Sequence, residues 1–184
     1  MASPVTSPDV LPSPGQAVLI RFDDRDTVVW WGKGEGDREI LAAHDGRLLT
    51  WDTVEEAVSF AGDADWKIDW DSGIDSEQNT LMDFTGAQRR LENDRHPVEP
   101  HSAMDLWNFA TDVSHTLGIP FHDSGTMADI CHEKITKATV PYAFGLDEYA
   151  LKWTPAEFKV VRRIMADAVH VVRTGLGRES TRPA

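Results

Sequence analysis

The sequence predicts an α+β domain, in which an N-terminal antiparallel β-meander of four to five strands packs against C-terminal helices. Three observations favour this fold class. Short runs rich in valine, isoleucine and tryptophan, separated by turn signals, occupy the first third of the chain. Apolar positions recur at helical spacing through the second half. Strands that precede helices are typical of α+β domains rather than of alternating α/β folds.

Apolar runs bounded by turn residues predict the strands. Residues 23–26 form the first expected turn, and glycines at 32, 34 and 36 interrupt the chain after the second run. Residues 44–46 supply a tight turn, because Asp-Gly tolerates positive φ. The expected strands are residues 17–22, 27–31, 38–42 and 47–51, with a short fifth strand at 80–84.

Capping signals and apolar stripes predict the helices. Asp52 and Glu55 form an expected capping box for a helix that ends at Gly62. Residues 154–157, Thr-Pro-Ala-Glu, combine a cap, a proline at the first helical position and the glutamate of a capping box. The helix that they start carries an apolar stripe and ends at Gly175. Further helices are expected at residues 85–94, from Ser102 to Leu117, and at 126–138.

The length of 184 residues and the 41% share of apolar residues predict one packed domain. We place it at residues 17–175, between a disordered proline- and serine-rich tail at 1–16 and a second disordered tail at 176–184. The single cysteine, Cys131, excludes an intrachain disulfide and favours a cytoplasmic location. No apolar run approaches the length of a membrane span, and no signal peptide is expected.

The charge of the chain is large and unevenly placed. Its 31 acidic and 18 basic residues give a formal net charge of −13. This balance argues against a nucleic-acid partner and against an anionic membrane surface, and it favours a basic protein partner. Residues 52–83 hold ten acidic residues and one basic residue, whereas residues 152–184 have a net charge of +4. A surface that attracts a basic partner is therefore predicted in the acidic stretch.

Two tryptophans lie among the carboxylates of the acidic stretch. An aromatic anchor beside acidic side chains is typical of a contact site, because tryptophan often dominates binding energy and the charges speed encounter. The alternative is that each ring packs onto the sheet, and for either tryptophan taken singly this alternative is favoured. For the stretch as a whole, a binding role is favoured. The predicted partner-binding residues are Asp63, Asp65, Trp66, Asp69, Trp70, Asp71, Asp75 and Glu77.

Patterns for metal binding and catalysis fail on spacing. A calcium loop that began at Asp63 or Asp69 would need glycine at its sixth position, where Ile68 and Ile74 stand. The seven histidines form no His-x-x-x-His or Glu-x-x-His pair typical of zinc sites. Cys131 lies in an expected helix, and a small buried thiol is favoured over a nucleophile. We therefore predict no catalytic residue, no cofactor and no metal.

Five short stretches, in their order along the chain, carry a resemblance. They are residues 34–41, 52–57, 81–84, 105–113 and 153–157. With the size and acidity of the chain, they resemble the small acidic immunity proteins of bacterial toxin–immunity systems. The resemblance implies a cytosolic protein that binds a cognate toxin domain and neutralises it without catalysis. If that toxin is a nuclease, its basic nucleic-acid groove is a surface that an acidic protein can block.

Two other function classes stay open. A regulatory or adaptor module would bind a protein of its own pathway through the last helix, where Arg162, Arg163 and Arg173 lie opposite the apolar stripe. A small hydrolase-like enzyme would need a site assembled from distant histidines and acids, for which no spacing in the sequence argues.

Overall fold

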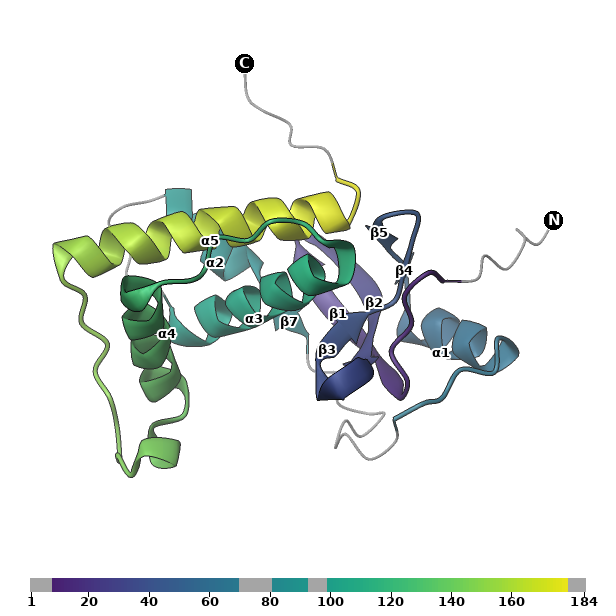
Figure 1. Cartoon of the computed structure of the whole chain (residues 1–184), viewed down its shortest axis with the longest axis horizontal. Helices are drawn as coiled ribbons and strands as arrows, with labels where there is room; N and C mark the ends of the chain where they lie inside the picture. Colours follow the sequence, from purple (N-terminus) through teal and green to yellow (C-terminus); the bar gives the residue numbers. More distant parts are fainter. Residues whose placement is uncertain (1–7, 70–80, 93–98, 179–184) are drawn as a thin grey trace, which may run out of the picture.

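The structure is a computed structural model that describes residues 8–69, 81–92 and 99–178. It is an α+β fold, as predicted, with a sheet in the N-terminal part and mostly C-terminal helices (Figure 1). The strands are β1 (Gly15–Phe22), β2 (Arg25–Lys33), β3 (Glu39–Leu41), β4 (Ala43–His44), β5 (Arg47–Leu48), β6 (Thr50–Trp51) and β7 (Met82–Asp83). The helices are α1 (Val54–Asp63), α2 (Thr85–Glu92), α3 (Pro100–Leu117), α4 (Thr126–Thr139) and α5 (Pro155–Gly175), with short 3₁₀ turns η1 (Glu35–Asp37) and η2 (Pro141–Phe144).

The centre of the sheet is the antiparallel pair β1–β2. The register runs without a break from Gly15 opposite Gly32 to Phe22 opposite Arg25. Asp23 and Asp24 connect the strands with φ values of 52° and 56°, a left-handed conformation that suits a two-residue hairpin turn. The main sheet has the order β3-β2-β1-β7, and β6 also pairs with β2.

Two details of the predicted meander differ in the structure. The expected strand at 47–51 is divided, because Leu48 packs into one core and Leu49 against the other. Its first half, β5, pairs with β4, and its second half, β6, pairs with β2. The expected strand at 80–84 is the short β7, which lies parallel to β1. A parallel neighbour needs a long crossover, and the segment that contains α1 provides it.

Both faces of the β1–β2 pair are apolar, and alternating side chains therefore build two cores. Ile20 and Phe22 belong to the larger core, which residues from α2, α3, α4 and α5 complete. Val28 and Trp30 belong to the smaller core, which α1 covers. The expectation that all the helices lie on one face of the sheet is therefore wrong, because α1 covers the opposite face from α2 to α5. In Figure 1, α1 lies on one side of the strands and the later helices lie on the other.

Local capping explains where the helices begin. The capping box of α5 is formed by Thr154 and Glu157 as predicted, with Pro155 in the first turn. For α1 the cap is Thr53, one residue after the predicted Asp52. Helix α3 was expected to begin at Ser102, but Ser102 already lies within the helix. The Glu99 carboxylate caps α3 instead, because it accepts hydrogen bonds from the backbone N–H groups of His101 and Ser102.

Described residues on both sides of the predicted domain, 17–175, form hydrogen bonds with it. The Asp9 backbone N–H donates to the Ala43 carbonyl at 2.8 Å, and Ser13 donates to the Lys33 carbonyl at 2.8 Å. At the other end, the Arg178 guanidinium donates to the Phe22 carbonyl at 2.7 Å. The described parts of both predicted tails are therefore attached to the sheet by hydrogen bonds.

Asp23 joins the β1–β2 turn to two helices. Its carboxylate accepts two hydrogen bonds from Arg173 of α5, at 3.0 and 2.6 Å, and one from the Gln88 amide of α2 at 2.8 Å. The Arg173 hydrogen bond is the main cause that lowers the pKa of Asp23 below its ordinary value.

Within the described residues, no helix combines the length and apolarity that a membrane crossing requires.

Asp112 is a buried acid on α3, with 8% of its surface exposed. Burial raises its pKa from 3.8 to about 7, and the negative charge of Glu39 contributes in the same direction. The folded state therefore binds this proton more tightly than the unfolded chain. The stability that the protonated group contributes is lost as the pH rises through the folded-state pKa.

We expect Asp112→Asn to raise the free energy of unfolding at pH 8 and to change it little at pH 4, because asparagine resembles the protonated acid and cannot ionise. Each pKa unit is worth about 1.4 kcal/mol, which sets a ceiling of about 4 kcal/mol on the gain at pH 8. Urea unfolding of both proteins from pH 4 to pH 8 measures the difference. An equal effect of the substitution at every pH would contradict the raised pKa.

Candidate functional site

The structure describes four of the eight predicted partner-binding residues. Asp63 and Asp65 are exposed at the end of α1. Asp69 is half-buried, and its backbone N–H donates to the Gly15 carbonyl at 2.8 Å, so this segment runs beside the start of β1. The fourth is Trp66. The predicted residues Trp70, Asp71, Asp75 and Glu77 lie outside the described residues.

Trp66 is part of the smaller core. Its side chain is 9% exposed, and its ring centroid lies 5.5 Å from that of Trp30 and 5.2 Å from that of Phe60. Trp51 packs against the same ring at 6.3 Å. The structure therefore favours the packing alternative for Trp66, and this ring does not present an aromatic anchor to a partner.

Exposed apolar side chains lie in another part of the molecule. All the large apolar side chains that are exposed within the described residues fall between residues 127 and 146, on α4, on η2 and just after it. Tyr142 is the most exposed of them, at 78%. Figure 1 places α4 and α1 at opposite ends of the long axis. We define the α4–η2 surface as these side chains: Met127, Ile130, Tyr142, Phe144 and Leu146.

The segment that carries the α4–η2 surface is acidic. Residues 119–150 contain five acidic and two basic residues, a net charge of −3. Both lysines are engaged by carboxylates: Lys134 donates to both oxygens of Glu157 at 2.8 Å, and Lys137 pairs with Glu133. The first pair also attaches α4 to the beginning of α5. The exposed apolar side chains therefore lie in a segment with a net negative charge.

A groove of about 600 Å³ borders this surface between α3, α4 and η2. Phe144 belongs both to the lining of the groove and to the α4–η2 surface. The residues that line it are Trp107, Asn108, Thr111, Asp123, Asp129, His132, Glu133, Thr136 and Phe144.

Hydrogen bonds fix the inner wall of the groove. The Trp107 indole N–H donates to Asp123 Oδ2 at 3.2 Å, and the Thr111 hydroxyl lies 3.4 Å from the same oxygen. The loop that carries Asp123 is attached to α5, because the His122 backbone N–H donates to Asp167 at 2.8 Å. The Asp123 carboxylate is therefore held in place by α3 and, through its loop, by α5.

His132 forms part of the same wall. Its ring packs edge-on against Trp107, with centroids 5.0 Å apart. Burial lowers the pKa of His132, and the nearby charges of Asp123 and Asp129 only partly oppose this effect. The imidazole is therefore neutral at pH 7 and does not compensate the carboxylates that line the groove.

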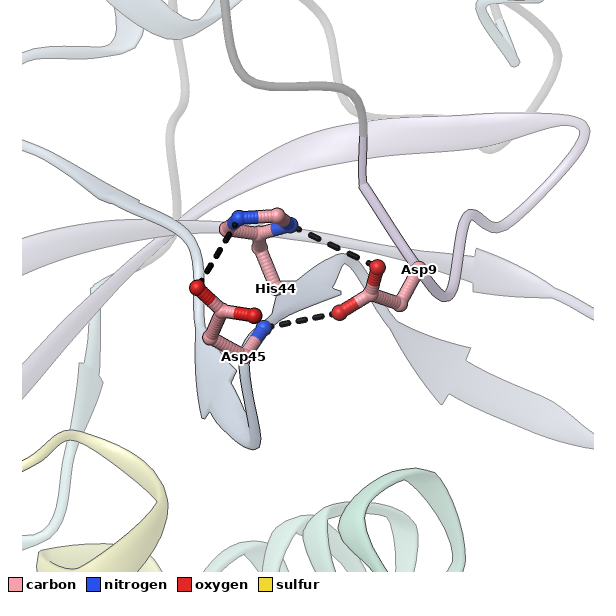
Figure 2. Close-up of side chains that lie close together, drawn as sticks. All are labelled: Asp9, His44 and Asp45. Carbon is pink, nitrogen blue, oxygen red and sulfur yellow. Dashed lines mark hydrogen bonds and ion pairs between the residues drawn. The ribbon is translucent and has the colours of Figure 1, made fainter.

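A histidine between two carboxylates forms a second cluster, drawn in Figure 2. His44 Nδ1 lies 3.5 Å from Asp9 Oδ1, and His44 Nε2 lies 3.2 Å from Asp45 Oδ2. One ligand atom from each of the three side chains lies within 4.8 Å of the other two, so the group could hold a metal ion, although the two carboxylates face different ring nitrogens. The Asp45 backbone N–H also donates to Asp9 Oδ2 at 2.7 Å. We assign this cluster the structural role of attaching the N-terminal segment to the β4–β5 turn.

Three other residues noted in the sequence, Cys131, Arg173 and Gly32, have structural roles. Cys131 is buried, and burial raises the pKa of its thiol, which is the opposite of what a nucleophile needs. Arg173 was proposed as a contact of an adaptor module, and in the structure its guanidinium donates two hydrogen bonds to the Asp23 carboxylate. Gly32 of the glycine-rich stretch faces the Pro14 carbonyl, 2.3 Å from where a Cβ would lie, so close backbone packing explains this glycine.

Sequence reasoning missed both the groove and the α4–η2 surface. A usable signal was present between the expected helices at 126–138 and after Thr154, since Tyr142, Phe144 and Leu146 place three large apolar residues within five positions there. Large apolar side chains in an irregular segment indicate either a core contact or a binding surface. The His44 cluster gave no local signal, because Asp9 is distant in the sequence.

Comparisons of this chain with protein-family models, with curated proteins and with solved structures each found no match.

We expect Trp66→Ala to lower the free energy of unfolding by about 3 to 5 kcal/mol, because it leaves a cavity among three aromatic rings. The matched control is Tyr142→Ala, which removes an exposed ring and is expected to change stability by less than about 0.5 kcal/mol. Urea unfolding of the two variants and the parent chain measures both effects. Equal stability of the two variants would contradict the core assignment of Trp66.

Proposed function

We propose that this chain is an immunity-type inhibitor that binds a cognate toxin domain and blocks it by contact, without catalysis. The single observation that carries the proposal is the α4–η2 surface, because every exposed large apolar side chain among the described residues falls in this one segment of the chain. Contiguous exposed apolar patches with a polar rim mark protein interaction sites. We propose this surface, rather than Trp66, as the centre of the interface.

The charge of the chain supports a basic partner. The formal net charge is −13, and carboxylates border the proposed interface. Acidic side chains around an apolar centre speed the encounter with a basic protein, whereas the apolar contacts determine how long the complex lasts. Asp63 and Asp65, at the opposite end of the molecule, would contribute to long-range attraction only.

Protection of cells is the direct test of this function. We expect co-expression of the chain to rescue cells that express the toxin domain encoded beside its gene, and the two purified proteins to form a complex. Rescue should fail with an unrelated toxin domain. Unchanged killing in the presence of well-folded chain, together with no complex between the purified proteins, would refute the proposed function.

We expect Tyr142→Ala to weaken that complex by about tenfold to a hundredfold, mainly through faster dissociation, because exposed aromatic anchors carry much of the binding energy. Surface plasmon resonance measures both rate constants. The parent chain and Tyr142→Ala should have similar thermal stability, which separates loss of contact from loss of fold.

Two charge-matched double variants distinguish the two acidic ends. Asp147→Asn/Glu148→Gln and Asp63→Asn/Asp65→Asn remove the same charge, and asparagine tolerates the positive φ of 57° at position 65. We expect the first pair to slow association severalfold at low salt and the second to slow it less, with the difference shrinking as salt rises. The opposite order would place the interface near α1 and contradict the proposed centre.

A further inference from the structure

The groove between α3 and α4 is lined by acidic side chains without a basic side chain among its described lining residues. Asp123, Asp129 and Glu133 contribute carboxylates, and the only ionisable nitrogen base in the lining, His132, is neutral at pH 7 because burial lowers its pKa. Glu133 is paired with Lys137, so Asp123 and Asp129 supply the uncompensated charge. A cation is therefore the favoured occupant.

The walls of the groove select among cations. Phe144, His132 and Trp107 all line the groove, and the ring of Trp107 packs edge-on against that of His132. A guanidinium is planar, stacks on aromatic rings and binds carboxylates with paired N–H donors, whereas an ammonium is a compact and strongly hydrated charge. Aromatic walls together with two carboxylates therefore fit a guanidinium better than an ammonium.

Lys137 gives an example within the chain of a cation that contacts both an aromatic ring and a carboxylate of the groove lining. Its amino group lies 5.5 Å from the centroid of the Phe144 ring while it pairs with Glu133. The rim thus already holds a cation between an aromatic ring and a carboxylate. Asp123 and Asp129 offer carboxylates for a second cation along the same groove.

We infer that this groove receives an arginine side chain of the partner protein. The guanidinium would lie against Phe144 and His132 and pair with Asp123 and Asp129, while the apolar side chains of the α4–η2 surface contact the partner around it. The inference rests on the proposed function, because it takes the arginine from the toxin domain.

The test uses n-butylguanidinium as the probe and n-butylurea as a neutral probe of nearly the same shape. The Trp107 indole N–H donates to Asp123, so its NMR signal, assigned with Trp107→Phe, reports on the groove. We expect n-butylguanidinium to shift this signal in a saturable way at millimolar concentration. We expect n-butylurea to shift it at least tenfold less at equal concentration.

Substitutions in the chain locate the binding. Asp123→Asn keeps an acceptor for the Trp107 indole, and Asp129→Asn changes an exposed residue; each should weaken binding of the probe about five- to tenfold. Asp63→Asn removes the same charge at the exposed end of α1, far from the groove, and should leave the affinity within twofold of the parent value. Equal shifts from both probes, or equal losses from all three substitutions, would overturn the inference.

The same measurements separate this inference from the proposed function. Rescue of cells by the chain, with no saturable shift from n-butylguanidinium, would overturn the arginine groove and leave the inhibitor role standing. A saturable shift that Asp123→Asn and Asp129→Asn reduce, with no rescue and no complex with the toxin domain, would refute the inhibitor role. In that case the toxin domain could not supply the arginine, and the inference about a partner arginine would also be refuted.

Discussion

Burial of the β1–β2 pair on both faces is the constraint on which the rest of the structure depends. Ile20 and Phe22 on one face, and Val28 and Trp30 on the other, are fully buried. A strand pair that is apolar on both faces must be covered twice, since one exposed face would cost the free energy of hydrating those side chains. The chain meets this requirement with α1 and Trp66 on one face and with α2 to α5 on the other.

This arrangement separates the two ends of the molecule by role. The α1 end is acidic, but among its described residues Trp66 is buried in the smaller core, where it packs against Phe60. At the other end, α4 packs on α3 and α5 through Cys131 and Ile135, and it extends away from the sheet (Figure 1). Met127 and Ile130 on its outer face are therefore exposed. The proposed interface follows from this position of α4 beyond the edge of the sheet.

Helix caps and turns could be predicted where the interactions that stabilise them join residues close together in the sequence. The start of α5 was predicted correctly, because Thr154, Pro155 and Glu157 satisfy one another's backbone groups within one turn. The position of the Asp-Gly turn followed from its preference for positive φ. The α1 cap was displaced by one residue, since Thr53 and Asp52 are both capable of capping and the surrounding contacts decide between them.

The amino-acid pattern alone established the α+β class, the order of the elements and the acidity of the chain, because these depend on neighbouring residues and on composition. Packing decided the rest. An aromatic ring among carboxylates has the same sequence context in a core as on a surface, and only the fold places Trp66 inside and Tyr142 outside. Likewise, Trp107 and Asp123 line one groove because α3, α4 and the loop that joins them fold against α5. Contacts of this kind depend on the relative position of whole elements, which local sequence does not encode.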